Sequence, residues 1–289
     1  HKAITLSGAC AIGLTLAFAA PAAADDAKPI NFRAVGGAVL GGTWNVGLTG
    51  VGGGSLMTPL LVLLFGIHPS VAVGTDLLYA AITKAGGTLA HGLKGTVDWS
   101  ITRRLAYGSI PAAALTLLVL GQVAPGGIGG ATGLIKVALG VALLLTAVAI
   151  IFRKQIQDFA LRHSEGRENP RRTATLTVVT GAVLGVLVSI SSVGAGALGV
   201  SALFFLYPRL PTLRIIGSDI AHAVPLTLVA GIGHWMLGSV DWSLLGSLLI
   251  GALPGIWLGS HISTRVPDRV LRPILAGMLV LVGSKLIAA

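Results

Sequence analysis

The chain has 289 residues, of which 54% are hydrophobic and only 10% are charged, and its mean hydropathy is +0.88. A soluble domain carries about 25% charged residues, so this chain cannot cover a water-facing surface and we expect lipid to be its solvent. The net charge of +10 does not indicate nucleic-acid binding, because the basic residues stand in short loops between apolar runs. A single cysteine, Cys10, excludes a disulfide framework and a cysteine-based metal site.

The first residues have the pattern of a targeting segment. Lys2 precedes the apolar residues 3–20, and Pro21-Ala22-Ala23-Ala24 follows before Asp25 and Asp26. A basic start, an apolar centre and an A-x-A site are typical of a secretory signal peptide, so we predict that residues 1–24 are one. The alternative is an uncleaved first helix, since about 18 apolar residues just span a bilayer.

Eight apolar runs follow, and the first run of each half is too long for one span. The runs cover residues 34–66, 69–92, 104–121, 131–152, 173–206, 212–237, 243–262 and 270–288. The first would form a helix of about 50 Å, against a hydrocarbon core of about 30 Å. Glycine-rich breaks interrupt both long runs, at Gly50–Ser55 and Ser192–Gly196. Because glycine lets the chain leave helical geometry, we interpret both runs as re-entrant hairpins or broken helices.

Loop charge predicts which loops are cytoplasmic. Lys and Arg residues gather in loop 94–104, in loop 153–172, at Arg209 and Arg214, and between Arg265 and Arg272. By the positive-inside rule all of these are cytoplasmic, which requires that each long run enters and leaves the membrane on one side. Each half then contains a hairpin and three full spans. An odd number of crossings makes the two halves inverted repeats.

An internal repeat supports this division. Gly95–Ser100 (GTVDWS) matches Gly238–Ser243 (GSVDWS) at an offset of 143 residues, and at the same offset Gly74–Asp76 (GTD) matches Gly217–Asp219 (GSD). Duplicated halves are common in secondary transporters. We therefore predict an all-α integral membrane protein, divided into a first membrane repeat, a basic cytoplasmic linker loop and a second membrane repeat, at residues 34–152, 153–172 and 173–289.

The chain resembles the TauE/SafE family of sulfite exporters and related anion permeases. The resemblance covers about residues 35–288, and its carriers are Gly50–Pro59 (GVGGGSLMTP), Pro69–Asp76 (PSVAVGTD), the Gly-x-Val-Asp-Trp turns at 95–99 and 238–242, and Gly194-Ala195-Gly196. It implies transport of a small sulfur-containing anion, sulfite or an organosulfonate, without ATP-binding machinery. The sequence has no Walker motif, which agrees with that expectation.

The two glycine breaks are the first candidate substrate site. The start of a helix after a break exposes backbone N–H groups and a positive dipole end, which suit an anion, and nearby hydroxyls add donors. The alternative is that these glycines only let helices pack closely. The candidate substrate-binding residues at the breaks are Gly52, Gly53, Gly54, Ser55, Thr58, Ser191, Ser192, Gly194 and Gly196.

Lys84 is the strongest single candidate for binding an anion. It stands fifteen residues into an apolar run, where a charge is expensive and usually faces the bundle interior or a cavity. We expect it to pair with the anion or with Asp76. The alternative is that it reaches back to the cytoplasmic face, over about 15 Å. The repeat places Thr227 at the equivalent position, so any role of Lys84 is asymmetric.

Other ionisable residues are candidates for coupling to an ion gradient. Asp76 and Asp219 occupy equivalent positions, where a carboxylate can carry a proton or, alternatively, only cap a helix. His91 and His234 are also equivalent, and histidine relays protons near neutral pH, although it is more often a hydrogen-bonded packing residue. His222 stands in mid-span and is the better candidate for lining a cavity.

These observations predict a multi-pass transporter in a bacterial inner (plasma) membrane that exports its anion with an ion gradient. The alternatives are a permease for another small anion and an anion channel. No HExxH motif or recognisable catalytic pair indicates an enzyme, and we expect no cofactor and no metal. The expected partners are the anionic substrate and the lipid bilayer, not nucleic acid, and the sequence permits a homo-oligomer without requiring one.

Overall fold

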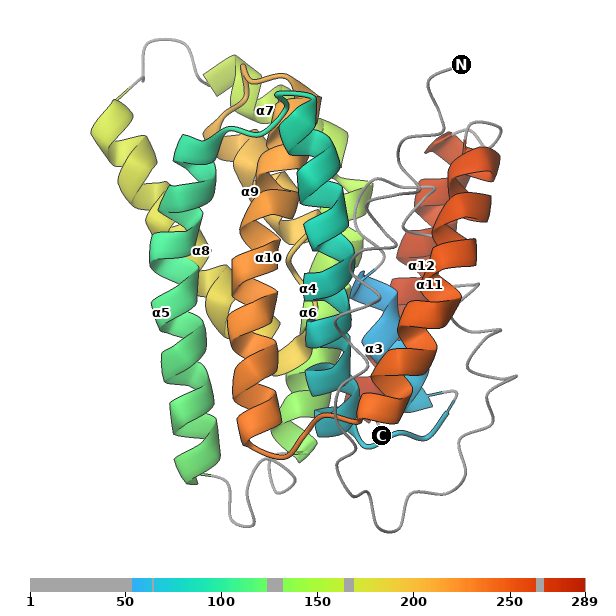
Figure 1. Cartoon of the computed structure of the whole chain (residues 1–289). Helices are drawn as coiled ribbons and strands as arrows, with labels where there is room; N and C mark the ends of the chain where they lie inside the picture. The colour runs from blue at the N-terminus through green and yellow to red at the C-terminus, as the bar shows by residue number, and fades with distance from the viewer. Residues whose placement is uncertain (1–53, 64, 124–131, 164–168, 264–267, 289) are drawn as a thin grey trace.

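The computed structural model describes residues 54–63, 65–123, 132–163, 169–263 and 268–288. Every element within these residues is a helix (Figure 1). They are α3 (Gly54–Leu63), α4 (Pro69–Leu93), α5 (Trp99–Val123), α6 (Thr132–Ile151), α7 (Arg153–His163), α8 (Pro170–Ser191), α9 (Ala197–Leu206), α10 (Thr212–Met236), α11 (Trp242–Ser263) and α12 (Asp268–Ala288). The expected all-helical fold is confirmed. The predicted signal peptide, residues 1–24, lies outside the described residues.

The outer surface of the bundle is apolar. Helices α5, α6, α8 and α10 are long and apolar enough to cross a membrane. Large hydrophobic side chains point outward from them, among them Leu118 on α5, Leu145 on α6 and Val183 on α8. Soluble monomers rarely expose apolar surface so extensively, whereas a bilayer covers it without cost. The bundle is therefore membrane-embedded, as the composition predicts.

Helices α8 and α9 form the hairpin that the second long run predicts. The chain turns between them at Ser192–Gly196, and the start of α8 meets the end of α9, where the Thr177 and Tyr207 hydroxyls lie 2.8 Å apart. Three further helices, α10, α11 and α12, complete this half. In the first half, α3 begins at Gly54, inside the predicted break, and the residues before it lie outside the described part of the chain.

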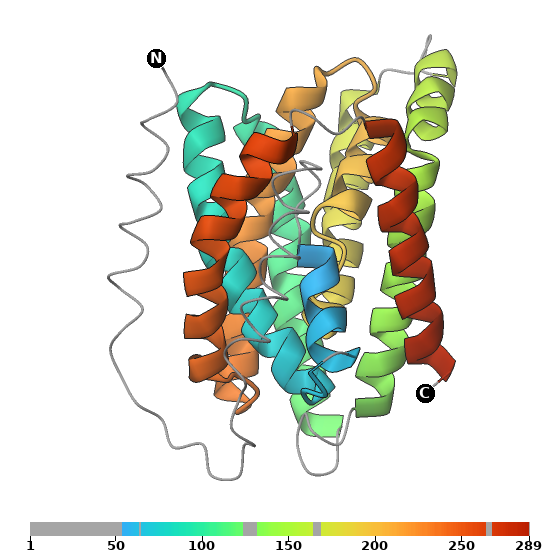
Figure 2. The same cartoon turned by 90° about the vertical axis from the view of Figure 1, so that its right-hand side faces the viewer.

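Equivalent helices of the two halves run in opposite directions. In Figure 1, α4 and α6 rise from the lower to the upper end of the bundle, whereas α10 and α12 descend, and α5 descends while α11 rises. Figure 2 shows the same directions from the side. The α4–α5 and α9–α10 connections both lie at the upper end, and they carry the basic residues Lys94 and Arg209.

The GTD segment of α4 and the GSD segment of α10 occupy equivalent positions in the repeat. Each contacts the Val-Asp-Trp turn of the other half. The Thr75 hydroxyl of α4 accepts a hydrogen bond from the Asp241 backbone N–H at 3.0 Å. The Ser218 hydroxyl of α10 accepts one from the Asp98 backbone N–H at 2.8 Å. Thr75 and Ser218 are equivalent in the repeat, and so are Asp98 and Asp241. Exchange of the same contact in both directions is what a two-fold axis between equivalent units produces.

The aspartates of those turns also cap the helices that follow them. The Asp98 carboxylate accepts hydrogen bonds from the Ser100 and Ile101 backbone N–H groups, at 3.0 and 3.3 Å. The Asp241 carboxylate accepts one from Leu244 at 2.9 Å. These are N-cap bonds, which satisfy backbone donors that the first turn of a helix leaves unpaired. The Val-Asp-Trp turns therefore start α5 and α11.

Small residues bring α5 and α8 into close contact. A side chain at Gly181 of α8 would collide with the backbone oxygen of Leu105, and one at Gly185 with that of Ser109. From the α5 side, Gly108 lies as close to the backbone of Val178. Gly181 and Gly185 form the G-x-x-x-G spacing that allows membrane helices to approach backbone to backbone.

The segment 153–172, expected as a basic loop, contains α7 and the first residues of α8. Helix α7 is held against the hairpin by aromatic contacts. The Arg153 guanidinium lies 4.7 Å from the centre of the Phe204 ring, and the Phe159 ring stacks on Phe205 with centroids 6.5 Å apart. The high charge content of this segment does not indicate a helix, because the apolar face of α7 is only a few residues wide.

Candidate functional site

The turn between α8 and α9 is a buried stretch of non-helical backbone inside the bundle. Ser192 adopts left-handed geometry at φ 59°, and Gly194 and Gly196 have φ of 126° and 143°, values that side chains rarely permit. Residues 192–196 are all buried. The Ser191 hydroxyl joins the turn to α8, because it accepts a hydrogen bond from the Val193 backbone N–H at 3.2 Å and donates one to the Leu187 carbonyl at 2.6 Å. Irregular backbone at this depth leaves carbonyl and N–H groups available to a cavity or a bound ion.

Asp76 of α4 joins this turn to α3. Its Oδ2 accepts hydrogen bonds from the Thr58 hydroxyl at 2.6 Å and from the Ser192 hydroxyl at 2.8 Å. The carboxyl group is fully buried, and its Oδ1 finds no hydrogen-bond partner among the described residues. Two of the hydroxyls predicted to meet the anion therefore converge on Asp76, one from each half of the repeat.

Lys84 lies two helical turns beyond Asp76 on α4. Its Nζ donates a hydrogen bond to the Ala195 carbonyl oxygen in the turn, at 2.7 Å. The side chain is half-buried, and it reaches into the bundle and not to the end of the helix. The ammonium also interacts electrostatically with the Asp219 and Asp76 carboxyl groups. A positive charge is thus held beside the broken backbone, and its hydrogen-bond acceptor is a carbonyl oxygen, not the Asp76 carboxylate that the sequence suggested.

Asp219 and His222 bring α10 to the same region. The Asp219 carboxyl packs against Gly199 of α9, where any side chain would collide with Oδ1, and that oxygen has no partner among the described residues. One turn later, His222 Nε2 lies 2.8 Å from the Ser109 hydroxyl of α5. The His222 ring is fully buried, Nδ1 has no partner within the described chain, and Lys84 acts on it electrostatically.

The other two candidate histidines, His91 and His234, lie in the reciprocal contact between the α4 and α10 regions. His91 Nδ1 is 2.8 Å from the Thr96 hydroxyl, and its ring lies against Gly217. His234 Nε2 is 2.8 Å from the Ser189 carbonyl, and its β-carbon lies against Gly74. Their positions are those of hydrogen-bonded packing residues, the alternative that the sequence offered for them.

The structure assembles some of the predicted residues and leaves others undescribed. Thr58, Asp76, Lys84 and Ser192 meet at the α8–α9 turn, with Gly194 and Gly196 in its backbone, and Asp219 and His222 interact electrostatically with Lys84. Gly54 and Ser55 begin α3, but their side chains lie outside the described part, as do Gly52 and Gly53 altogether. Within the described residues, no three His, Cys, Asp or Glu side chains gather in a metal-binding group.

Sequence reasoning missed three contributors to this site. They are the Ala195 carbonyl, Gly199 and Ser109. A backbone acceptor such as the Ala195 carbonyl cannot be recognised from the residue type, because every residue has one. The A-L-G start of α9 did carry a signal for Gly199, since a small residue in a short helix after a break often marks a close approach.

Comparisons with known proteins identify the family of this chain. The family model "Sulfite exporter TauE/SafE" matches residues 34–286. A relative from Bacillus subtilis (strain 168), "Probable membrane transporter protein YjnA", is 42% identical over 243 residues, which is 84% of this chain and 94% of the relative. Two more distant relatives carry the same kind of name. "Probable membrane transporter protein YdhB" of that organism is 27% identical, over 82% of this chain and 94% of its own. A "Probable membrane transporter protein" of Xylella fastidiosa (strain 9a5c) is 25% identical, over 76% and 80%.

No solved structure shows significant similarity to the chain. The family match nevertheless covers both repeats and every residue of the Lys84 region, from Thr58 to His222. The chain therefore belongs to the TauE/SafE sulfite exporter family of membrane transporters.

Proposed function

We propose that the protein exports a small sulfur-containing anion, sulfite or an organosulfonate, across a bacterial inner membrane, driven by an ion gradient. The observation that carries this proposal is the Lys84 ammonium, which bonds the Ala195 carbonyl in the buried turn between α8 and α9. A cation held beside unwound backbone inside a membrane bundle is suited to bind an anion. The family match supports the substrate class.

Binding would exchange one partner of Lys84 for another. An oxyanion accepts hydrogen bonds from an ammonium more strongly than a neutral carbonyl does, so it can displace the Ala195 oxygen. The first backbone N–H groups of α9, which follow Gly196, and the Ser192 hydroxyl supply further donors. In this pose Ser192 would turn from Asp76 toward the anion.

Charge balance explains why the transport is expected to depend on protons. The buried region holds one ammonium, Lys84, and two carboxyl groups, Asp76 and Asp219. An arriving anion adds a negative charge, which a low-dielectric interior tolerates poorly unless a positive charge or a proton accompanies it. We assign Asp76 and Asp219 as the proton carriers, with His222 next to them.

The alternating access of such a carrier would come from inverted repeats. Opposite directions of equivalent helices and the reciprocal Thr75–Asp241 and Ser218–Asp98 hydrogen bonds support this reading. The α4–α10 interface would then be the pivot about which one half rocks against the other. The end that carries the basic connections would face the cytoplasm.

The test is uptake of radiolabelled sulfite into proteoliposomes that hold the purified full-length protein, with and without a pH gradient. Saturable uptake that responds to the gradient is the expected result. Linear uptake without saturation would replace the carrier by a channel. If folded protein shows no sulfite flux above empty liposomes, the same assay with taurine and with a small carboxylate decides between an organosulfonate and another anion.

A further inference from the structure

His222 of α10 is held from α5 by a hydrogen bond in the interior of the bundle. Its Nε2 lies 2.8 Å from the Ser109 hydroxyl, and both residues are fully buried. The backbone of Ser109 is itself fixed against α8, because a side chain at Gly185 would collide with it. Helices α5, α8 and α10, which the structure describes over their whole length, thus keep this pair in one place.

The Ser109 hydroxyl does not follow the usual pattern of hydroxyls in these helices. The side chains of Thr116, Thr146 and Thr227 each donate to the carbonyl four residues earlier in their own helix. Among the described residues, the hydroxyl of Ser109 has one partner, and this partner is His222 Nε2 on another helix. A buried hydroxyl that bonds a titratable ring, and not its own backbone, indicates a role for that ring.

This hydrogen bond decides which nitrogen of neutral His222 carries the proton. A serine hydroxyl has one proton to donate. If Nε2 is unprotonated, the Ser109 hydroxyl donates to it and both groups are satisfied. If Nε2 carries the proton, the hydroxyl becomes the acceptor, and its own proton then has no acceptor within the described chain, which is costly for a buried donor. Ser109 therefore favours the form of His222 that carries its proton on Nδ1.

The other ring nitrogen of His222, Nδ1, lies on the face of α10 that carries Asp219. The two residues are three positions apart, and helical side chains at this spacing are neighbours that lean toward the preceding turn. Nδ1 is the ring nitrogen nearer to the backbone, so it stays close to that turn. Both Nδ1 and the Asp219 Oδ1 are buried without a partner in the part of the chain that the structure describes. An unpaired donor and an unpaired acceptor thus share one face of the helix.

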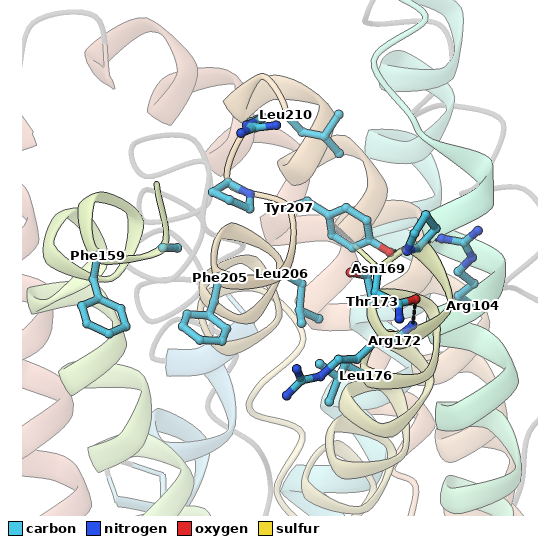
Figure 3. A pocket seen from close by; sticks show the side chains of 14 residues that line it. Arg104, Phe159, Asn169, Arg172, Thr173, Leu176, Phe205, Leu206, Tyr207 and Leu210 are labelled. Atoms are coloured by element: carbon cyan, nitrogen blue, oxygen red, sulfur yellow. Dashed lines mark hydrogen bonds between the residues drawn. The ribbon is translucent and has the colours of Figure 1, made fainter. Parts of the chain in front are cut away.

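Lys84 is the charged group that acts electrostatically on both Asp219 and His222. Helix α9 has no titratable side chain, and α8 has none beyond its first turn. Arg104 of α5 donates to the Tyr207 hydroxyl at 3.4 Å, near the α9–α10 connection. Both of these residues line a cavity of about 520 Å³ there, which the hydrogen-bonded pair does not line (Figure 3). Among the described residues, Lys84 is therefore the charge that sets the surroundings of this pair.

We propose that Ser109 is a positioning residue of the transporter, which holds the His222 proton on Nδ1 so that the ring donates a hydrogen bond to the Asp219 carboxylate. This inference rests on the proposed function, in which Asp219 takes up and releases a proton. When Asp219 releases its proton, the carboxylate gains the Nδ1–H donor, directly or through one water molecule. When Asp219 takes a proton up again, His222 keeps its own proton and stays neutral.

The position of the proton on His222 is measured by nitrogen-15 NMR of the purified full-length protein labelled at its histidines. The His222 signals are identified by their loss in His222→Asn. We expect the native protein, and Ser109→Thr, which keeps the hydroxyl, to carry the proton on Nδ1. Ser109→Ala should shift the ring toward the form protonated at Nε2, because nothing then keeps that nitrogen free of a proton. A native ring protonated at Nε2 would overturn the proposal, whether or not the protein transports sulfite.

Uptake into proteoliposomes measures the effect on transport. Ser109→Ala should lower the maximal rate of gradient-driven sulfite accumulation about tenfold, which is the effect of one hydrogen bond to a charged group. The KM for sulfite should not change, because Ser109 acts on Asp219 and does not bind the anion. The matched control is Thr116→Ala on the same helix, which removes a hydroxyl that bonds the Ala112 carbonyl. Its rate should stay near that of the native protein.

A double variant tests whether Ser109 acts through His222. In His222→Asn an amide N–H replaces Nδ1–H as the donor, and no tautomer remains to be fixed. Adding Ser109→Ala to this variant should therefore lower the rate no further. A further loss as large as that in the native background would show that Ser109 acts by packing, and would overturn the proposal. If the native protein shows no sulfite flux, the proposed function fails, while the NMR measurement still decides where Ser109 holds the proton.

Discussion

The Lys84 side chain connects α4 to the turn of the other half of the protein through a single hydrogen bond to Ala195. For a single residue such as Lys84, we expect anion binding to depend on which group accepts the hydrogen bond of its ammonium. A carbonyl oxygen carries no net charge, so an anion can replace it as the hydrogen-bond acceptor without first breaking a direct ion pair. A carboxylate as the direct partner would have opposed that replacement.

Replacing Lys84 by alanine should reduce sulfite uptake at least tenfold while the yield of folded protein stays near normal. A hydrogen bond to a charged group contributes about 1.5–3 kcal/mol, and its loss from the bound state corresponds to a tenfold effect or more. The matched control is Lys94→Ala, at the exposed end of the same helix. Uptake by Lys84→Ala at the native rate would remove this residue from the mechanism.

Replacing Asp76 by asparagine should separate coupling from binding. The asparagine oxygen can still accept from Thr58 and Ser192, so the local hydrogen bonds persist, but the side chain no longer carries a proton. We expect gradient-driven accumulation of sulfite to be lost while exchange of external for internal sulfite continues. Proteoliposome counterflow measures the second quantity, and a variant that still accumulates sulfite against a pH gradient would contradict the role.

At the scale of helices, the close contact of α5 and α8 supports the hairpin. Gly181→Ala should lower the unfolding temperature in detergent by several degrees, because the new methyl group meets the Leu105 backbone and overpacking costs about 1–3 kcal/mol. Gly246→Ala on α11 is the control, since nothing lies within 4 Å of the added carbon. Equal unfolding temperatures for the two variants would show that α5 and α8 are not packed as described.

Hydropathy and glycine content predicted most of the elements and the place of the hairpin turn. They did so because both properties act locally: a run of apolar residues needs lipid, and glycines permit the φ values found at Gly194 and Gly196. Helix α7 was missed, since its stability comes from Phe204 and Phe205, about fifty residues away. The partner of Lys84 was missed for the same reason, because Ala195 lies 111 residues further on and offers only its backbone.

At the scale of the whole molecule, the inverted arrangement can be tested at two equivalent positions. Leu93 at the end of α4 and Met236 at the end of α10 are 83% and 80% exposed and are related by the repeat offset. With Cys10 replaced by serine, single cysteines there should react with a membrane-impermeant maleimide from opposite sides. In intact cells Met236→Cys should label, whereas Leu93→Cys should label only after permeabilisation. Labelling of both from one side would exclude inverted halves.

The repeat places Thr227 where the first half has Lys84. Within the described part of the chain, the Thr227 hydroxyl donates to carbonyls of its own helix, Ala223 at 2.8 Å and Val224 at 3.4 Å. If the two halves were identical and inverted, a two-fold axis in the membrane plane would relate the inward-open form of the empty carrier to the outward-open form. The two forms would then have equal free energy. A lysine in one half alone removes that degeneracy. We therefore expect the unloaded protein to rest preferentially in one of the two orientations, because of a residue that only one half carries.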